Sequence, residues 1–390
     1  MAGHRQHRKP NRQKTERPEK SAPMQQTAKN NVDTLPLPAA RFPYENLFAW
    51  YDRHGRQLPW RRRWPELAPA YHVWLSEIML QQTVVATVTP YFLDFTRRWP
   101  SIAELAAARL DDVLAAWAGL GYYARARNLH KAAKLVTSAY DGQFPSDQKA
   151  LLALPGVGPY TAGAISVIAF GQPGVVVDGN IERVMSRFFA IKTPLPAAKP
   201  EIAAVYAHSC PGARPSDFPQ AMMDFANAVC TAKVPACSAC PLAASCQGFA
   251  AGLASQLPMK APKPTKPTRR GVAFVAIGRD GEVFLERRPD KGLLGGMLAF
   301  PSSGWTQVAD PQNDAASQRQ APFAADWQKL EPPVHHVFTH FTLEMTVFVA
   351  HMAVPLPHHN SGAWQQPQPA DLPSLMRKIW SAAKAFQPAR

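Results

Sequence analysis

The sequence has no run of about 18 apolar residues, which is the length that a membrane-spanning helix requires. Its first residues carry charges but no apolar core and no small-residue cleavage site, so they do not resemble a secretory signal. These absences predict a protein without a membrane partner that stays in a reducing, cytoplasmic compartment. Cysteine is also scarce, with five residues, and in such a compartment cysteines are more often metal ligands or free thiols than disulfides.

Acidic residues are few compared with basic ones. The chain has 43 Lys and Arg against 28 Asp and Glu, which gives a formal net charge of +15. A surplus of this size favours a polyanionic partner, either nucleic acid or an anionic membrane surface. The alternative is a solvated basic surface with a basic tail, and the N-terminal segment does carry part of the surplus.

The first two segments differ sharply in composition. Residues 1–40 are rich in Arg, Lys, Gln and Pro, which predicts a disordered basic arm that either attracts phosphates or has no function. Residues 41–250 have apolar residues at helical spacing and almost no strand-like alternation, which predicts an all-α domain. The expected helical stretches are 71–88, 111–117, 124–139, 147–153, 159–170 and 180–190.

The remaining residues predict a linker and a second domain. Residues 251–270 are rich in Pro and Lys, which is typical of a semi-rigid linker. In residues 271–390 the spacing of the apolar residues is no longer helical. VAFVAI and EVFLERR flank the turn GRDG, which indicates a hairpin. The stretch VFTHFTLEMTVFVAHM adds strand-like material, and 373–386 reads as a helix. The second domain is therefore expected to be smaller and α+β.

Four of the five cysteines form a cluster with the spacing C-x6-C-x2-C-x5-C, at Cys230, Cys237, Cys240 and Cys246. Zinc sites usually present two close pairs, whereas this cluster has a single C-x-x-C. Four thiolates in one loop can instead hold an iron–sulfur cluster. Cys210 lies outside the pattern and is expected to be an ordinary buried thiol.

The cysteine spacing is similar to the 4Fe-4S loop of the endonuclease III superfamily of DNA glycosylases. The resemblance implies that residues 230–246 bind a 4Fe-4S cluster with a mainly structural role. The stretch LPGVG resembles the helix–hairpin–helix of the same superfamily. Gly156 and Gly158 would let backbone N–H groups at a helix N-terminus approach a DNA phosphate, and Pro159 suits the first position of that helix.

Two residues after the glycines refine the comparison with this superfamily. Asp178 precedes a helix, where aspartate is a common N-cap, and it also matches the superfamily's essential aspartate; both roles are compatible. Bifunctional members carry a lysine in the hairpin, at the place where GPYTAG has Tyr160. The resemblance therefore implies a monofunctional glycosylase without a lyase step.

Further motifs are similar to the adenine DNA glycosylase family over residues 42–250, namely LPWR, WLSEIMLQQT, GLGYYARARNLHKAA, LPGVG, DGN and QAMMD. The resemblance implies that Glu77 is the catalytic acid and that Asp178 stabilises the transition state, supported by Tyr160 and Asn180. It implies that Gln82 and Tyr122 insert into the duplex beside the lesion. The remaining residues that it assigns form the adenine pocket: Arg56, Leu58, Trp60, Arg61 and Gln220.

Glu77 is the only carboxylate in the apolar stretch VWLSEIMLQQT. A buried unpaired carboxylate is strongly disfavoured in a core, but an acid that must keep its proton needs apolar neighbours that raise its pKa. Helical spacing places Glu77 beside Val73, Trp74, Leu80 and Gln81. The stretch is therefore interpreted as an active-site helix that meets DNA.

The C-terminal domain resembles the family's Nudix-like domain through RPDKGLLGGMLAFP. The following residues, PSSGWTQVADPQNDAAS, lack the Glu-rich run that holds metal ions in working Nudix hydrolases, so pyrophosphate hydrolysis is not expected. The resemblance implies that this domain reads 8-oxoguanine opposite the adenine. The residues assigned are Phe338, Thr339 and His340, with threonine in place of the family's usual serine.

These resemblances predict hydrolysis of the N-glycosidic bond of adenine mispaired with 8-oxoguanine or guanine, which leaves an abasic site in double-stranded DNA. The enzyme is expected to be a nucleoid-associated monomer. Two alternatives remain: an endonuclease III-like bifunctional enzyme for oxidised pyrimidines, and a non-catalytic iron–sulfur module that binds DNA or senses redox state. Tyr160 in place of lysine disfavours the first, and the retained acid and aspartate disfavour the second.

Overall fold

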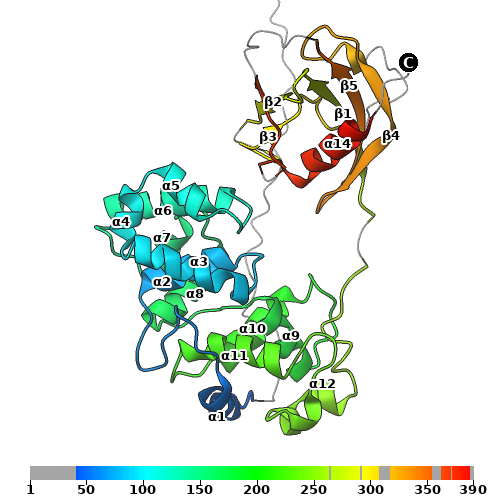
Figure 1. The fold of residues 1–390 in the computed structure, drawn as a ribbon. Coiled ribbons are helices and arrows are strands. Elements are labelled where there is room, and N and C mark those ends of the chain that lie inside the picture. Colours follow the sequence, from blue (N-terminus) through cyan, green and yellow to red (C-terminus); the bar gives the residue numbers. More distant parts are fainter. Residues whose placement is uncertain are drawn as a thin grey trace, which may run out of the picture. The chain divides into compact units, whose positions relative to one another are not determined.

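The computed structural model describes residues 41–262, 265–289, 292–306, 317–353, 362–369 and 371–386 (Figure 1). The predicted N-terminal arm, 1–40, lies outside these ranges, as do residues 307–316 of the stretch that follows the Nudix-like motif. The contacts divide the chain into two compact units between Ala261 and Pro262. Among the residues described, no helix has the length and apolar character needed to cross a membrane.

The first unit is helical, which confirms the all-α expectation. Its regular elements are α1 (Tyr44–His54), α2 (Ala70–Leu80), α3 (Val85–Arg98), α4 (Ile102–Ala107), α5 (Leu110–Ala116), α6 (Ala124–Ala139), α7 (Gln148–Leu152), α8 (Pro159–Phe170), α9 (Gly179–Phe188), α10 (Lys199–Ser209), α11 (Asp217–Ala228), the 3-10 turns η2 (Cys237–Ala239) and η3 (Ala243–Ser245), and α12 (Gln247–Ala250).

Local sequence signals explain where several of these helices begin and end. Helix α4 begins with a capping box, in which Ser101 and Glu104 satisfy each other's backbone N–H groups. Helix α8 has Pro159 in its first turn and ends at Gly171, whose φ of 62° is a left-handed conformation that glycine adopts easily. Helix α9 begins at Asp178, whose side chain accepts two backbone N–H bonds.

The predicted helix over 71–88 is two helices, and this corrects the sequence-based expectation. Helix α2 ends at Leu80 and α3 begins at Val85, because Gln82 adopts a left-handed backbone with φ of 60°. The apolar spacing continues through the break, so periodicity could not reveal it. As a result, Gln82 lies on an exposed turn and not on the face of a helix.

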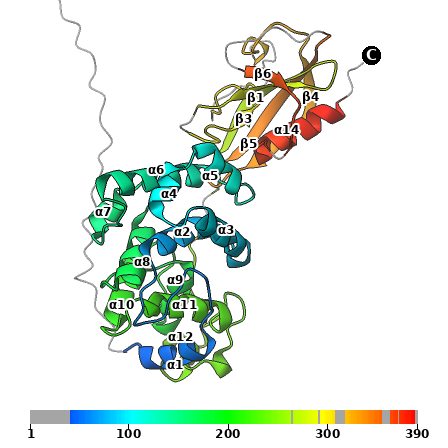
Figure 2. The same ribbon diagram turned by 60° about the vertical axis from the view of Figure 1, so that its left-hand side comes forward.

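Two groups of helices build the first unit (Figures 1 and 2). In one group α2 packs against α3, α6 and α8, and α4 packs against α6. In the other, α1 lies beside α11 although they are far apart in sequence, and α9 contacts α10, α11 and α12. Helix α8 is buried on nearly every side, and it contacts both α2 of the first group and α11 of the second.

The second unit is a six-stranded sheet with a helix on one face, which confirms the α+β expectation. Its elements are β1 (Thr268–Ile277), β2 (Val283–Arg287), β3 (Leu298–Ala299), β4 (Gln328–Val337), β5 (Thr342–His351), β6 (Gly362–Gln365) and α14 (Ser374–Ala385). The order is β3-β2-β1-β5-β4, with β6 also paired to β2. Strands β1 and β2 form the predicted antiparallel hairpin, whereas β1 and β5 are parallel.

Both faces of this sheet are covered, as the continuous apolar run of β1 requires. Ala273, Val275 and Ile277 face one core, which also contains Met376 and Ile379 of α14. The alternate residues of β1 face a second core, built on aromatic rings such as Phe274 and Trp327, which meet edge to face at 5.2 Å.

The segment predicted as a linker, 251–270, is partly ordered against both units. Leu257 is buried, and Leu195 donates to the Met259 carbonyl and accepts from the Ala261 N–H, so this stretch lies in the first unit. Thr268 already begins β1. Residues 263 and 264 lie outside the described ranges.

Gly163 in α8 gives a test of this packing. A methyl group there would meet the Val175 carbonyl oxygen at 2.7 Å, so Gly163→Ala should lower the free energy of unfolding by about 1–3 kcal/mol despite alanine's better helix propensity. Gly179→Ala is the matched control, because a methyl group at that helical glycine meets nothing within 4 Å. Thermal denaturation measures both, and equal melting temperatures for the two variants would contradict the packing.

Candidate active site

A pocket of about 610 Å³ lies in the first unit, between helices of both groups. Its walls come from the loop after α1, from α2 and the turn that follows it, from α8 and α11, and from the start of α9. Nine of the predicted site residues line this one cavity: Arg56, Leu58, Trp60, Arg61, Glu77, Tyr160, Asp178, Asn180 and Gln220. Residues from five separate parts of the chain therefore converge on the same space.

Glu77 projects from α2 into this pocket among buried neighbours that include Ser76, Ile78 and Met79. Burial and, second, the nearby charge of Asp178 raise the pKa of Glu77 from 4.5 to about 7, although a hydrogen bond with Tyr160 and the charge of Arg61 oppose the shift. A carboxyl group with a pKa near neutrality can hold a proton and also release it, as a general acid must.

Asp178 is held in an arrangement that stabilises negative charge. Its Oδ1 accepts from the backbone N–H groups of Asn180 at 3.0 Å and Ile181 at 2.8 Å, and its Oδ2 accepts from the Asn180 side-chain amide at 2.7 Å. The N-terminal end of α9 adds its partial positive charge. The predicted N-cap role is thus present at a residue that also lines the pocket.

The other predicted pocket residues are fixed by packing and hydrogen bonds. Trp60 is buried and meets the Phe92 ring edge to face at 5.2 Å. Gln220 is buried and donates to the Ser216 carbonyl at 2.8 Å. Burial, followed by the charges of Glu77 and Asp178, raises the pKa of Tyr160 well above its usual value, so its hydroxyl stays neutral and can donate a hydrogen bond.

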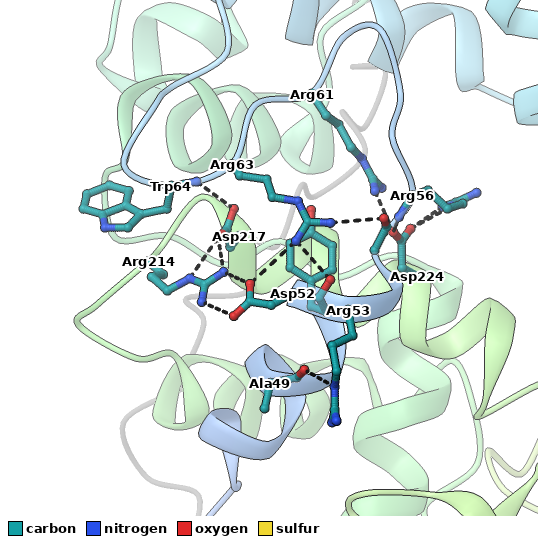
Figure 3. Close-up of polar contacts among 12 residues, drawn as sticks. Ala49, Asp52, Arg53, Arg56, Arg61, Arg63, Trp64, Arg214, Asp217 and Asp224 are labelled. Carbon is teal, nitrogen blue, oxygen red and sulfur yellow. Dashed lines mark hydrogen bonds and ion pairs between the residues drawn. The ribbon is translucent and has the colours of Figure 1, made fainter.

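Asp224 of α11 holds both pocket arginines (Figure 3). Its carboxylate accepts from the Arg56 backbone N–H at 2.8 Å and from Arg56 Nε at 2.7 Å, and Arg61 Nη1 donates to its second oxygen at 2.8 Å. The Asp224 side chain is 1% exposed. Burial would raise its pKa, but the charge and hydrogen bonds of Arg61 and Arg56 outweigh burial and hold the pKa of Asp224 below its usual value.

Gln82 and Tyr122 do not line the pocket but lie exposed on two neighbouring turns, both with left-handed backbones. One guanidinium joins the turns: Arg125 donates to Gln81 O at 2.7 Å and to Leu120 O at 2.8 Å. It also donates to the carbonyls of Ile78 and Met79 at the end of α2. Side chains on both turns are therefore presented to solvent from a fixed base.

The predicted phosphate site has the expected backbone. Gly156 has φ of 81°, and a methyl group there would approach Asn128 Cβ to 3.0 Å. Gly158 is the N-cap of α8, directly before Pro159. The N-terminal N–H groups of a twelve-residue helix therefore follow a glycine turn, as the helix–hairpin–helix resemblance predicted.

In the second unit, Thr339 and His340 are exposed on the turn between β4 and β5. The preceding Phe338 stacks on Trp305 at 5.7 Å and packs against Phe341 at 4.8 Å. Lys266 donates to the Phe338 carbonyl at 2.7 Å. The aromatic ring thus anchors the turn that carries the two exposed polar residues.

The four clustered cysteines surround one further cavity of the first unit, and none of them forms a disulfide. In the residues described, no group of three or more His, Cys, Asp or Glu side chains is arranged to hold a metal ion. Arg187, which is almost fully buried, donates to Cys230 Sγ at 3.3 Å and to the carbonyls of Thr231 and Ala232. Cys210 lies apart, and burial raises the pKa of its thiol to about 11.

A short chain of hydrogen bonds connects the cysteine loop with the pocket. Arg183 of α9 donates to the Cys230 carbonyl at 2.8 Å and to the Asn180 side-chain oxygen at 3.2 Å. Asn180 in turn holds Asp178. The loop and the aspartate are therefore positioned by the same helix.

Sequence reasoning missed three polar residues that organise the site. Asp224 was part of the motif QAMMD but received no role, and Arg125 and Arg183 stood in motifs or helices without an assignment. Their partners lie up to 168 residues away along the chain. An aspartate directly after the apolar pair Met222 and Met223 was the one signal that could have pointed to Asp224.

Two protein-family models match this chain, one in each unit. Residues 75–204 match the model of the HhH-GPD superfamily of base excision DNA repair proteins. Residues 272–382 match the NUDIX domain model.

Several curated relatives are similar to this chain. The adenine DNA glycosylase of Homo sapiens is 35% identical over 78% of this chain and 66% of its own length, so the chain spans about two thirds of the human protein. That of Buchnera aphidicola subsp. Schizaphis graminum is 30% identical over 85% of this chain and 95% of its own. That of Mycolicibacterium smegmatis is 40% identical over 53% of this chain and 69% of its own.

Glu77→Gln should stabilise the fold in a pH-dependent way. Folding raises the pKa of Glu77, so ionisation of this group lowers the free energy of unfolding only above about pH 4.5. The loss grows up to about pH 7 and stays constant above that. The amide avoids this cost, so the variant should gain about 1–3 kcal/mol at pH 8 and almost nothing at pH 4.5. Denaturation curves at both pH values measure the difference.

Ser76→Ala is the control for that measurement, since Ser76 is a buried neighbour in α2 that carries no charge. Its effect on stability should be the same at both pH values. A Glu77→Gln effect that does not vary with pH would contradict the raised pKa.

Proposed function

Since the chain belongs to the adenine DNA glycosylase family, we propose that it removes adenine mispaired with 8-oxoguanine or with guanine. A DNA N-glycosylase of base excision repair hydrolyses the bond between base and sugar. The observation that carries the proposal is the shared pocket of Glu77 and Asp178, two carboxyl groups whose surroundings favour opposite charge states. Such a pair supplies an acid and an ionised stabiliser in one site.

Adenine leaves poorly as an anion, so the first task of the site is to protonate the base. Glu77 donates a proton to the flipped-out adenine, at N7, and its pKa of about 7 allows this near neutral pH. Tyr160 donates a hydrogen bond to Glu77 and thereby orients the carboxyl group. Trp60 and Leu58 supply apolar walls that exclude water from the base.

The second task is to stabilise the positive charge that develops on the sugar. The Asp178 carboxylate faces the same pocket and is held by three N–H donors, so it is preorganised for an adjacent cation. Water then adds to the sugar carbon and gives up a proton, which the Glu77 carboxylate in the same pocket can accept, and the product is an abasic site. Tyr160 occupies the hairpin position at which a lyase would need an amine, so hydrolysis ends the reaction.

Recognition of the opposite base is assigned to the second unit. Thr339 and His340 offer a hydroxyl and an imidazole on an exposed turn, which suits hydrogen bonding to the edge of 8-oxoguanine. The ring of Phe338 fixes that turn from within. In the first unit, Gln82 and Tyr122 are exposed on adjoining turns, where they can enter the gap in the duplex.

A 4Fe-4S cluster is the cofactor that the cysteine loop fits. Four free thiols surround one small cavity, and Arg187 already donates to one sulfur. Cys230, Cys237, Cys240 and Cys246 would hold the cluster. Its contribution is structural, because it would tie together a loop that has only short 3-10 turns of its own.

The reaction can be tested with a duplex that has adenine opposite 8-oxoguanine, guanine or thymine. The protein should release adenine from the first two, and the strand should break only after hot alkali, because no lyase step follows. Glu77→Gln and Asp178→Asn should each lower the single-turnover rate at least a hundredfold, since each removes a group used in the transition state.

Glu182→Gln is the matched control for that assay, because Glu182 lies on the same helix as Asn180 and pairs with Lys199 outside the pocket. Its rate should stay near that of the wild type. Failure of the wild type to release adenine would refute the function, and strand cleavage without alkali would favour a bifunctional enzyme.

The cofactor assignment predicts iron and acid-labile sulfide in equal amounts in the purified protein. Cys237→Ser should lose both and melt at a lower temperature, because one of four ligands is removed. Cys210→Ser should keep both, since Cys210 lies outside the loop. Zinc in place of iron, or no metal in wild-type protein prepared without air, would overturn the assignment.

A further inference from the structure

The pocket that contains Glu77 also contains two cations. Of the residues that line it, Arg56 and Arg61 are the positively charged ones, and both come from the loop after α1. Arg61 is the more enclosed, with 10% of its side chain exposed against 38% for Arg56. A fixed cation beside an acid favours loss of the proton, and the charge of Arg61 does lower the pKa of Glu77.

Asp224 pairs with both of these arginines and does not line the pocket. Its carboxylate is buried on α11 and forms an ion pair with each arginine, at 2.6 Å to Arg56 Nη2 and 2.8 Å to Arg61 Nη1. It also accepts the backbone N–H of Arg56, so it fixes the start of the loop as well as its charge. Asp224 does not line the pocket, so its action on a bound base is indirect.

We propose that Asp224 is a positioning residue that neutralises the arginines of the pocket wall, so that Glu77 keeps its proton while Arg61 remains available to the base. The inference rests on the function proposed above and adds a residue to it. Without Asp224 the pocket wall would carry two uncompensated positive charges. With Asp224, the net charge of Arg56, Arg61 and Asp224 together is +1.

The other charged groups around Glu77 do not replace this effect. Asp178 lines the same pocket and favours the protonated acid, whereas Tyr160 is neutral and donates a hydrogen bond to Glu77. Arg125 of α6 touches α2 through the carbonyls of Ile78 and Met79. Only Arg56 and Arg61 therefore bring positive charge to the pocket surface itself, among the residues described.

A second buried aspartate on the same helix provides a matched control. Asp217 begins α11, is fully buried, and pairs with Arg214, which also binds Asp52 (Figure 3). It accepts from the Trp64 N–H at 3.3 Å, so it also anchors the loop after α1. Neither Asp217 nor Arg214 lines the pocket, so loss of this pair should cost stability without changing the charge near Glu77.

The experiment is the pH dependence of single-turnover adenine release from a duplex with adenine opposite 8-oxoguanine. In the wild type the rate should fall as pH rises above about 7, because Glu77 loses its proton. Asp224→Asn should move this fall to lower pH by about one unit, as one added charge near a shielded acid does. At pH 8 its rate should then be about tenfold below the wild type, with a smaller difference at pH 5.

Two further variants separate charge from position. The double variant Asp224→Asn with Arg61→Gln has the same net charge on the pocket wall as the wild type. Its rate of adenine release should therefore fall at the same pH as that of the wild type, even if the rate itself is lower. Asp217→Asn should lower the melting temperature about as much as Asp224→Asn and leave the pH of the fall unchanged. Asp224→Glu keeps the charge and should also leave that pH unchanged.

The outcomes distinguish the proposals. If the wild type releases no adenine, the function itself fails. If it does, and folded Asp224→Asn keeps the wild-type pH dependence or Asp217→Asn shifts it equally, the role of Asp224 is overturned. If Asp224→Asn does not fold, the single variant Arg61→Gln is the test. Its rate of adenine release must fall at a higher pH than that of the wild type, and an unchanged pH profile overturns the inference.

Discussion

The structure of the first unit is governed by one electrostatic constraint, which is that a carboxyl group must keep its proton beside ionised neighbours. Glu77 has a pKa of about 7 because it is buried and faces Asp178. The same pocket contains Arg56 and Arg61, and the charge of Arg61 lowers the pKa of Glu77. Helix α11 resolves the conflict by placing a buried anion, Asp224, behind the arginines. In the mechanism that we propose, acid, stabiliser and cations then share a single cavity.

This constraint explains why helices from both groups meet at the pocket. Glu77 comes from α2 and Tyr160 from α8, whereas Asp178 caps α9 and Asp224 belongs to α11. The groups that raise the pKa of Glu77 and the N–H donors that hold Asp178 therefore come from different helices. The packing of α8 against α2 and α11 therefore does more than stabilise the fold, because it helps to bring Glu77, Tyr160 and Asp178 to one pocket.

Much of this arrangement could be predicted from the sequence, and the failures have a common cause. The helical domain and the sheet with its closing helix follow from periodicity, whereas the residues of the pocket were predicted from the resemblance to the adenine DNA glycosylase family. The break between α2 and α3 was missed because the apolar spacing runs through it and only the backbone of Gln82 departs from the helix. Asp224 and Arg125 were missed because their roles depend on partners far away in the chain, and a polar residue in a motif does not reveal its partner.

The guanidinium of Arg125 has a consequence for how the protein meets a duplex. It donates to carbonyls on the turns of Gln82 and Tyr122 at once, and its plane lies over the rings of Trp117 and Tyr122. Neither turn can shift without breaking hydrogen bonds that the other shares. If Gln82 and Tyr122 enter the duplex as we propose, their contributions to the free energy of opening a base pair are not independent. Their joint removal is then expected to cost less than the sum of the separate losses.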